Sequence, residues 1–311
     1  SWLPKMGSCT STVQHAIPEP KLKDSGAELS SPGTDSFHAD DEDPVFLVRQ
    51  GVLGQRHPID TPFGRRELVY ADYTASGRFL TQLEDFFNDK IAPLYANTHT
   101  EASATGAQTT VLREEARLII AQNVNAPANE YATLFVGTGC SGALEKMMKV
   151  FGISLPKYAD NKWNLSDHIP EEERPVVFIG PFEHHSNELA WRESICTVEV
   201  IPEDKYGCPD LEVLEQLLIK HQNRSMKIGS FSAGSNVTGI RIDTRKYSRL
   251  LHKYNALAFF DFAGSGAYVA INVKGDSEEE SMDGIYMSPH KFIGGPGCTG
   301  VLIAKRNLFD G

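Results

Sequence analysis

Residues 284–297 have the sequence Gly-Ile-Tyr-Met-Ser-Pro-His-Lys-Phe-Ile-Gly-Gly-Pro-Gly, which places Lys291 between an apolar run and a glycine-rich segment. The apolar residues 284–287 predict a short buried strand, and the glycines after Lys291 predict a tightly folded loop. A lysine on an ordinary loop is a solvated surface charge. A lysine that is desolvated between a strand and a tight loop can instead act as a nucleophilic amine. Its immediate neighbourhood leaves both interpretations open.

The chain around this stretch alternates apolar runs with amphipathic segments. The expected strands are 131–136, 175–179, 197–201, 227–231, 256–260, 284–287 and 301–304, and the expected helices are 141–153, 210–222 and 244–253. Alternation of this kind predicts an α/β fold with a mainly parallel sheet covered by helices. Because ligands of such sheets bind at the carboxyl ends of the strands, we expect the functional residues in the loops that follow the strands.

A glycine-rich turn follows the first of these strands, with the sequence Gly137-Thr138-Gly139-Cys140-Ser141-Gly142. The free N–H groups of a helix start can hold a phosphate, and glycines let the backbone approach it closely. The turn also fits the G-x-G-x-x-G dinucleotide fingerprint, although the acidic residue expected about 20 positions later is not evident. A plain tight turn is the third interpretation.

Three polar residues follow other strands. The flat imidazole of His184, after the strand 175–179, can stack on an aromatic cofactor, or it is an ordinary surface residue. Asn236 is either a hydrogen-bond donor to a ligand oxygen or a simple turn residue. Asp261 directly follows the apolar strand 256–260. A carboxylate there needs a partner, which is a protonated pyridine nitrogen, a helix end or a cation.

These features occur in an order that resembles the class V aminotransferase family, which includes the cysteine desulfurases. The most specific matching segments are Glu183-His184-His185-Ser186-Asn187, Ser235-Asn236-Val237-Thr238-Gly239 and Ser288-Pro289-His290-Lys291. The resemblance covers roughly residues 68 to 311. It implies the large domain of the aspartate aminotransferase fold, fold type I, in which a mixed, mainly parallel seven-stranded sheet lies between layers of helices.

The resemblance also implies the cofactor pyridoxal 5'-phosphate, whose ring is an electron sink. Lys291 would hold this cofactor as a Schiff base and move protons at the substrate α carbon. Asp261 would pair with the ring nitrogen, and His184 would stack on the ring face. These three residues would be the catalytic ones, and Asn236 would contact the ring oxygen.

The same resemblance implies how the cofactor phosphate and the substrate are held. Ser288, His290 and the turn Thr138-Gly139-Cys140 would bind the phosphate. The segments 70–76 and Asn97-Thr98-His99 are similar to the amino-terminal substrate-side loops of the family, so Asn97 and His99 would lie on the substrate side. No metal site is expected.

The sequence departs from the family pattern at several positions. Gly264 stands where the family commonly has a glutamine, and Gly139 stands where a phosphate-binding threonine is expected. We expect the smaller carboxyl-terminal domain to be missing, because only twenty residues follow Lys291. The family's arginine that binds the substrate carboxylate and the cysteine that accepts sulfur in desulfurases would be missing together with that domain. Cys298, in the glycine-rich loop, is interpreted as a small packing residue.

The first part of the chain has a different composition. Residues 1–44 are rich in Ser, Pro, Asp and Glu without an apolar period, which predicts a disordered arm ahead of a cofactor-binding domain over 45–311. The segment Met6-Gly7-Ser8-Cys9-Thr10-Ser11 fits the myristoylation pattern, and Cys9 is a candidate for palmitate. This interpretation requires Met6 to be the true start; a chance match is the alternative.

The overall composition argues against several classes of protein. A net charge of -11 argues against nucleic-acid binding, and no apolar run approaches the roughly 18 residues of a membrane span. The five cysteines form no C-x-x-C pair. A zinc site or a disulfide framework is therefore not expected, and a reducing, cytoplasmic location is favoured.

Three hypotheses about function follow. The leading one is a pyridoxal-phosphate enzyme that acts on an amino acid by cysteine desulfuration, transamination or a related reaction, as the homodimer that the family usually forms. The second is a nicotinamide-dependent oxidoreductase, which rests on the glycine turn alone. The third is a catalytically incomplete family relic, tethered to a membrane only if Gly7 and Cys9 are acylated.

Overall fold

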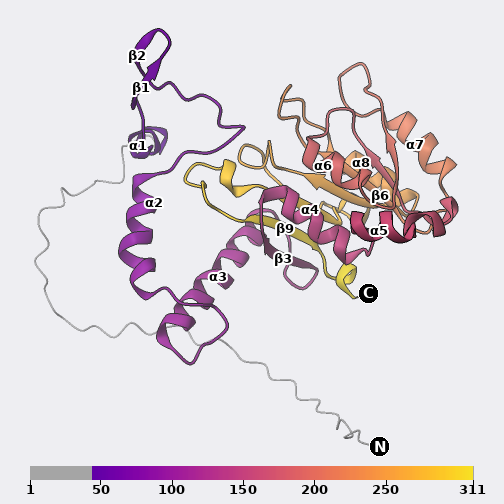
Figure 1. The fold of residues 1–311 in the computed structure, drawn as a ribbon, viewed down its shortest axis with the longest axis horizontal. Helices are drawn as coiled ribbons and strands as arrows, with labels where there is room; N and C mark the ends of the chain where they lie inside the picture. Colours follow the sequence, from indigo (N-terminus) through magenta and orange to yellow (C-terminus); the bar gives the residue numbers. More distant parts are fainter. Residues whose placement is uncertain (1–43, 311) are drawn as a thin grey trace, which may run out of the picture. The chain divides into compact units, whose positions relative to one another are not determined.

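A seven-stranded sheet lies at the centre of residues 44–310, which are the residues that the computed structural model describes (Figure 1). The strands are β3 (Tyr131–Val136), β4 (Val176–Ile179), β5 (Thr197–Val200), β6 (Lys227–Ser232), β7 (Leu257–Asp261), β8 (Gly284–Met287) and β9 (Gly300–Lys305), in the order β3-β9-β8-β7-β6-β4-β5. The neighbours from β5 to β8 are parallel, and β9 is antiparallel to β8 and β3. The predicted mixed, mainly parallel seven-stranded sheet is confirmed.

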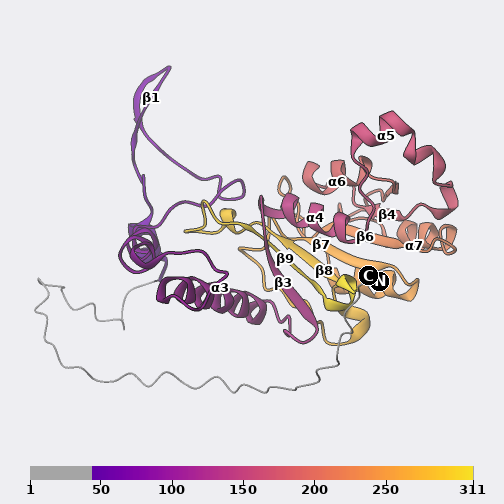
Figure 2. The same ribbon diagram turned by 60° about the horizontal axis from the view of Figure 1, so that its bottom comes forward.

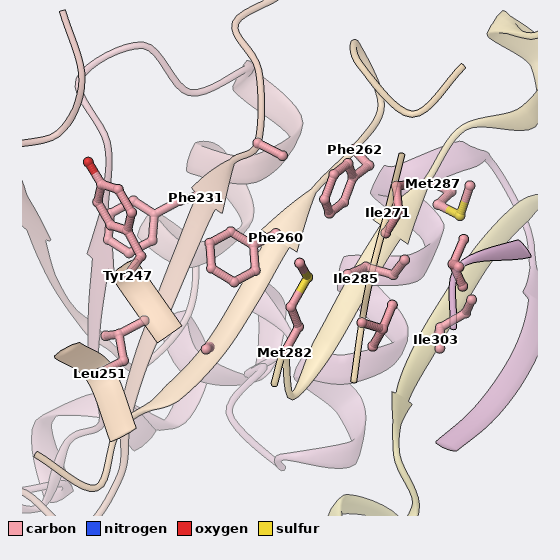
Figure 3. Close-up of a cluster of buried hydrophobic side chains, with 14 of the residues drawn as sticks. Phe231, Tyr247, Leu251, Phe260, Phe262, Ile271, Met282, Ile285, Met287 and Ile303 are labelled. Atoms are coloured by element: carbon pink, nitrogen blue, oxygen red, sulfur yellow. The ribbon is translucent and has the colours of Figure 1, made fainter. Parts of the chain in front are cut away.

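The central strands are apolar because helices cover both faces of the sheet. Every residue of β4 and β8 is buried, so neither strand shows polar alternation. Successive side chains of a strand point to opposite faces, and Phe259 and Phe260 accordingly belong to two different apolar clusters. Figure 3 shows the cluster around Phe260, in which Phe231, Leu251 and Ile285 pack together.

Each cluster is completed by its own set of helices. On one face, α4 (Gly139–Val150) and α6 (His185–Arg192) pack with Phe259 (Figure 2). On the other face, α7 (Leu211–Lys220), α8 (Thr244–Lys253) and the end of α3 (Ala104–Asn123) pack with Phe260. The sheet therefore lies between two helical layers, as the fold-type prediction requires.

The remaining elements are short. They are α1 (Pro44–Gly51), β1 (Pro58–Thr61), β2 (Gly64–Glu67), α2 (Thr81–Phe86), η1 (Phe87–Ile91), η2 (Ala92–Leu94), α5 (Lys157–Trp163), η3 (Leu165–His168), η4 (Glu171–Glu173), η5 (Glu278–Glu280), η6 (Pro289–Lys291) and η7 (Arg306–Phe309). No helix within 44–310 is both long and apolar enough to cross a bilayer. Residues 1–43 of the expected disordered arm (1–44) and the acylation pattern at Gly7 and Cys9 lie outside the described residues, whereas Pro44 begins α1.

A buried ion pair joins α8 to the sheet. Oδ2 of Asp283 lies 2.8 Å from Nε2 of His252 and accepts a hydrogen bond from the Ala258 N–H at 2.7 Å. Nζ of Lys305 lies 3.1 Å from the other carboxylate oxygen. Burial opposes the charge of Asp283, but these partners hold the pKa of its carboxyl below the ordinary 3.8. Burial likewise opposes the charge of His252, and Asp283 nevertheless raises the histidine pKa above 6.5.

The two pKa shifts define the pH window in which this pair stabilises the fold. The Asp283 contribution is complete above its unfolded pKa and is lost as the pH falls through the lowered folded value. The His252 contribution is complete below its unfolded pKa and is lost as the pH rises through the raised folded value. The pair is therefore strongest between about pH 4 and pH 6.5, the interval bounded by the two ordinary values.

We expect His252→Ala to lower the free energy of unfolding by about 1.5–3 kcal/mol near pH 6, because it removes a charge-assisted hydrogen bond from a buried carboxylate. The loss should be smaller at pH 9, where the wild-type imidazole is neutral. Urea unfolding of the two proteins at both pH values measures the difference. His168→Ala, at an exposed position, is the control. An equal loss at pH 6 and pH 9 would contradict the assignment of the stabilisation to the charged pair.

Candidate active site

A pocket of about 480 Å³ lies where the loops after several strands converge. Its lining residues are Asp72, Thr74, Ala75, Thr138, Cys140, Ser141, His184, Ser186, Asn236, Ala263, Ser288, His290 and Lys291. Apart from the first three, these residues follow the carboxyl ends of β3, β4, β6, β7 and β8. The structure thus brings together, at one edge of the sheet, residues that are far apart in the sequence.

Most of the residues predicted for the site line this pocket, but four do not: Gly139, Asp261, Asn97 and His99. Asp261, the last residue of β7, lies beside the lining residue Ala263. Asn97 and His99 are exposed in the connection between η2 and α3 and are not among the described lining residues. Their substrate-side role stays a prediction.

Asp261 is a buried carboxylate whose negative charge has no compensating ion pair within residues 44–310. Only 3% of the residue is exposed, and Oδ1 accepts a hydrogen bond from the Ala263 N–H at 2.7 Å. Burial raises the pKa of Asp261, against hydrogen bonds from Ala263 and Cys140 and the positive charge of Lys291. An uncompensated buried carboxylate is costly, so this position suits a cationic group of a ligand.

The glycine turn also lines the pocket. Gly139 begins α4 with a φ of 56°, and the Cys140 N–H donates to Ser288 Oγ at 3.0 Å. A Cβ at residue 139 would stand 2.7 Å from Ser288 Oγ and 2.8 Å from Cε1 of His290. Both the backbone conformation and the lack of space therefore explain why glycine replaces the expected threonine. The start of α4, beside Ser288 and His290, has the charge and donors that suit a phosphate.

Glu183 holds the His184 loop in place, a role that the sequence did not reveal. Its carboxylate accepts hydrogen bonds from the Gly180 N–H at 3.1 Å, the Asn187 side chain at 2.7 Å and the Ser232 hydroxyl at 2.7 Å. Burial raises the pKa of Glu183, against these donors. The carboxylate joins the end of β4 to the end of β6. A carboxylate next to a buried strand end was the available signal, but its partner Ser232 lies 49 residues further along the chain.

His184 itself caps α6 and lines the pocket. Its Nδ1 lies 2.8 Å from Ser186 Oγ and accepts a hydrogen bond from the Ser186 N–H at 3.2 Å. These contacts fix the Nδ1 edge of the imidazole, and the side chain lines the pocket. Asn236 lines the same pocket from the loop after β6.

The loop from Tyr70 to Arg78 supplies the pocket residues Asp72, Thr74 and Ala75, which belong to the segment 70–76 that resembles a substrate-side loop of the family. The Gly77 N–H donates to the His290 carbonyl at 3.0 Å, and the Gly294 N–H donates to the Arg78 carbonyl at 2.7 Å. These bonds join the loop to the lysine segment. No local pattern specifies such a contact, because its two sides are more than two hundred residues apart.

The interpretation of Cys298 as a packing residue is wrong, because this cysteine is exposed. Its N–H donates to the Gly295 carbonyl at 3.0 Å, and the preceding Gly297 has a φ of 86°. The tight turn carries the cysteine at the surface rather than into the core. No cluster of His, Cys, Asp and Glu suited to a metal ion is present within residues 44–310.

The sheet topology and the lysine pocket define the large domain of a fold type I enzyme. Residues 69–310 match the family described as Aminotransferase class-V. The chain therefore belongs to the class V aminotransferase family, whose members depend on pyridoxal 5'-phosphate. The nicotinamide hypothesis, which rested on the glycine turn, is not favoured.

Curated relatives include probable cysteine desulfurases of Staphylococcus aureus (strain COL) and Halalkalibacterium halodurans. The first is 26% identical over 256 residues, which cover 81% of this chain and 56% of the relative. The second is 25% identical over 252 residues, which cover 80% and 56%. The chain thus spans about half the length of the curated relatives it matches.

Solved structures support the same fold. The NifS-like protein from Rickettsia africae ESF-5 is 23% identical with a TM-score of 0.62, over 78% of this chain and 59% of that one. The apo cysteine desulfurase from Thermococcus onnurineus NA1 is 20% identical with a TM-score of 0.63, over 86% and 58%. At these identities the similarity establishes the fold alone.

Proposed function

We propose that this chain is the large domain of a pyridoxal-phosphate enzyme that acts on an amino acid, with cysteine as the first substrate to test. The observation that carries the proposal is a pocket lined by Lys291, next to which the buried carboxylate of Asp261 lies hydrogen-bonded to the lining residue Ala263 and without an ion-pair partner within residues 44–310. The names of the curated relatives favour cysteine desulfuration over transamination. The full activity, and the homodimer expected for it, belong to this proposal.

The residues of the pocket suit the two ends of the cofactor. When bound, the cofactor supplies an electron sink for the substrate α carbon. Asp261 holds a proton on the ring nitrogen through its negative charge, and the residues at the opposite end, Ser288, His290 and the N–H groups at the start of α4, bind the phosphate. In the protein without cofactor, burial and the charge of Lys291 lower the pKa of His290.

Lys291 has two tasks in this proposal. Its amine holds the cofactor covalently, and the same Nζ accepts and returns the proton at the substrate α carbon. His184 covers one face of the ring and excludes water there, while Asn236 donates to the ring oxygen and Thr138 adds a hydroxyl near the phosphate. A cytoplasmic location, and a membrane tether only if Gly7 and Cys9 are acylated, complete the proposal.

The direct test is spectroscopic. Purified protein mixed with pyridoxal phosphate should become coloured, and borohydride should fix the cofactor to Lys291, which peptide mass spectrometry locates. Sulfide release from cysteine, compared with keto-acid formation from other amino acids, then identifies the reaction. Protein that stays colourless and acquires no borohydride-fixed cofactor would reject the proposed function.

We expect Gly139→Ala to weaken pyridoxal-phosphate binding about tenfold or more. A side chain at this left-handed position costs roughly 1–3 kcal/mol, and it collides with Ser288 and His290 at the phosphate end. Fluorescence titration with the cofactor measures the change. Gly152→Ala is the matched control, because Gly152 has a φ of 68° and nothing within 4 Å of its Cβ position. Equal affinities of the two variants would contradict the assigned phosphate position.

A further inference from the structure

A second pocket, of about 250 Å³, lies on the amino-terminal part of the described chain and is positively charged. Its wall includes Arg49, Arg56 and Arg78 together with Tyr70, Tyr73 and Gln55. No aspartate or glutamate is among the described residues that line it. The whole chain carries a net charge of -11, so a small pocket lined by three arginines differs clearly in charge from the rest of the protein.

The most enclosed of these arginines, Arg78, is held in a fixed position. Its Nη2 donates to the Leu53 carbonyl at 2.9 Å, and its Cζ lies 4.9 Å from the centre of the Tyr70 ring. Gly54 has a φ of 75°, and a Cβ there would stand 2.6 Å from Arg78 Nη2. The backbone therefore packs closely against the guanidinium group, which leaves its position well defined.

The three guanidinium groups form no ion pair with any residue within 44–310. Elsewhere within residues 44–310, Arg113, Arg192 and Arg224 each pair with a glutamate at 3.1 Å or less. Guanidinium groups bind carboxylates and phosphates through paired hydrogen bonds, and they do so most strongly where a pocket limits access of water. The concave wall, the tyrosines and the unpaired arginines together have the chemistry of an oxyanion site.

We propose that this pocket, named here the arginine pocket, binds a small organic anion through a carboxylate or phosphate group. The Tyr70–Arg78 loop lies between the arginine pocket and the candidate active site. Asp72 and Thr74 line the active site, whereas Tyr70 and Tyr73 line the arginine pocket. An anion bound by the arginines therefore contacts the same loop that shapes the active site. The proposal goes beyond the proposed enzymatic function and does not rest on it.

Calorimetric titration with inorganic phosphate and, separately, with malonate tests the proposal, on protein with and without pyridoxal phosphate. We expect saturable binding of at least one anion, and the stronger of the two distinguishes a phosphate ligand from a carboxylate ligand. Arg56→Gln and Arg78→Gln should each weaken binding about tenfold or more, because each removes a charge-assisted contact. Arg65→Gln, on the exposed strand β2 outside the pocket, is the matched control and should leave the affinity unchanged.

Arg56→Gln keeps the test decisive even if Arg78→Gln fails to fold, since Arg56 is exposed. Absence of saturable binding of both anions up to about 10 mM would overturn the proposal, as would equal weakening by Arg65→Gln.

The acidic residues 40–43 precede α1 in the sequence. Unchanged affinity after their neutralisation to Asn and Gln supports a free anion, whereas binding that appears only after neutralisation would make this segment the occupant and overturn the proposal.

Discussion

Replacing Lys291 with alanine is expected to abolish covalent binding of pyridoxal phosphate and to lower turnover by about 10²–10⁴-fold or more. The variant loses both the amine that holds the cofactor and the group that moves the proton at the substrate α carbon. The side chain lies in η6 at the pocket and is only half-buried, so its removal leaves the core clusters intact. Absorbance with added cofactor and the rate of sulfide release from cysteine measure the two losses.

Lys205→Ala is the control for this experiment. Lys205 is an exposed lysine that contacts the ring of Tyr206, far from the pocket residues in the sequence. The Lys205→Ala variant should retain the wild-type colour and turnover. The cofactor-free Lys291→Ala variant should unfold at the same temperature as the cofactor-free wild-type protein. Wild-type colour in Lys291→Ala, with borohydride fixing the cofactor to another lysine, would show that the covalent residue is misassigned.

The sequence was most informative where an apolar strand ends in a polar residue. The strands before Asp261 and Lys291 are buried on both faces, so they form continuous apolar runs that are visible without a structure. The parallel order of the sheet then brings their carboxyl ends together. The prediction that the two residues lie at the same edge of the sheet followed from this rule and from the family resemblance, and it needed no side-chain detail.

The parts that the sequence did not reveal depend on contacts between distant segments. Glu183 accepts a hydrogen bond from Ser232, which lies 49 residues further along the chain, and the loop around Thr74 is positioned by hydrogen bonds to the lysine segment. A period of apolar residues carries no information about such pairs. Asn97 and His99 show that similarity to a family loop does not by itself locate a residue, because neither of them is among the described residues that line the pocket.

The surroundings of Gly264 do not require a glycine. A Cβ at this position would lie 3.4 Å from the Gly234 carbonyl oxygen and 3.5 Å from Cβ of Asn236. These are ordinary van der Waals distances, so the absence of the family's glutamine at this position has no steric explanation in the structure. Asn236, which lines the pocket from the loop after β6, is left as the donor proposed for the ring oxygen.

Replacing Asp261 with asparagine is the second experiment with a large expected effect. Turnover should fall about 10²–10³-fold, because the neutral amide cannot hold a proton on the ring nitrogen and a broken buried pair costs roughly 3–5 kcal/mol. The amide has nearly the same shape, so the pocket should keep its form and the cofactor should still reach Lys291. Steady-state kinetics and the absorbance of the bound cofactor measure these outcomes. Wild-type turnover in Asp261→Asn would contradict the proposed ionic partner.

The same substitution should act in the opposite direction on the protein without cofactor. Burial raises the pKa of Asp261 above 3.8, so its ionised form destabilises the fold at neutral pH, and stability should rise as the pH falls through the raised value. Asp261→Asn should therefore stabilise the cofactor-free protein, by about 1–3 kcal/mol. Asp283→Asn is the matched contrast: its carboxylate is equally inaccessible but is paired with His252 and Lys305, so its loss should destabilise. If both substitutions destabilise the cofactor-free protein, Asp261 is a structural residue with a partner of its own rather than one that is completed by the cofactor.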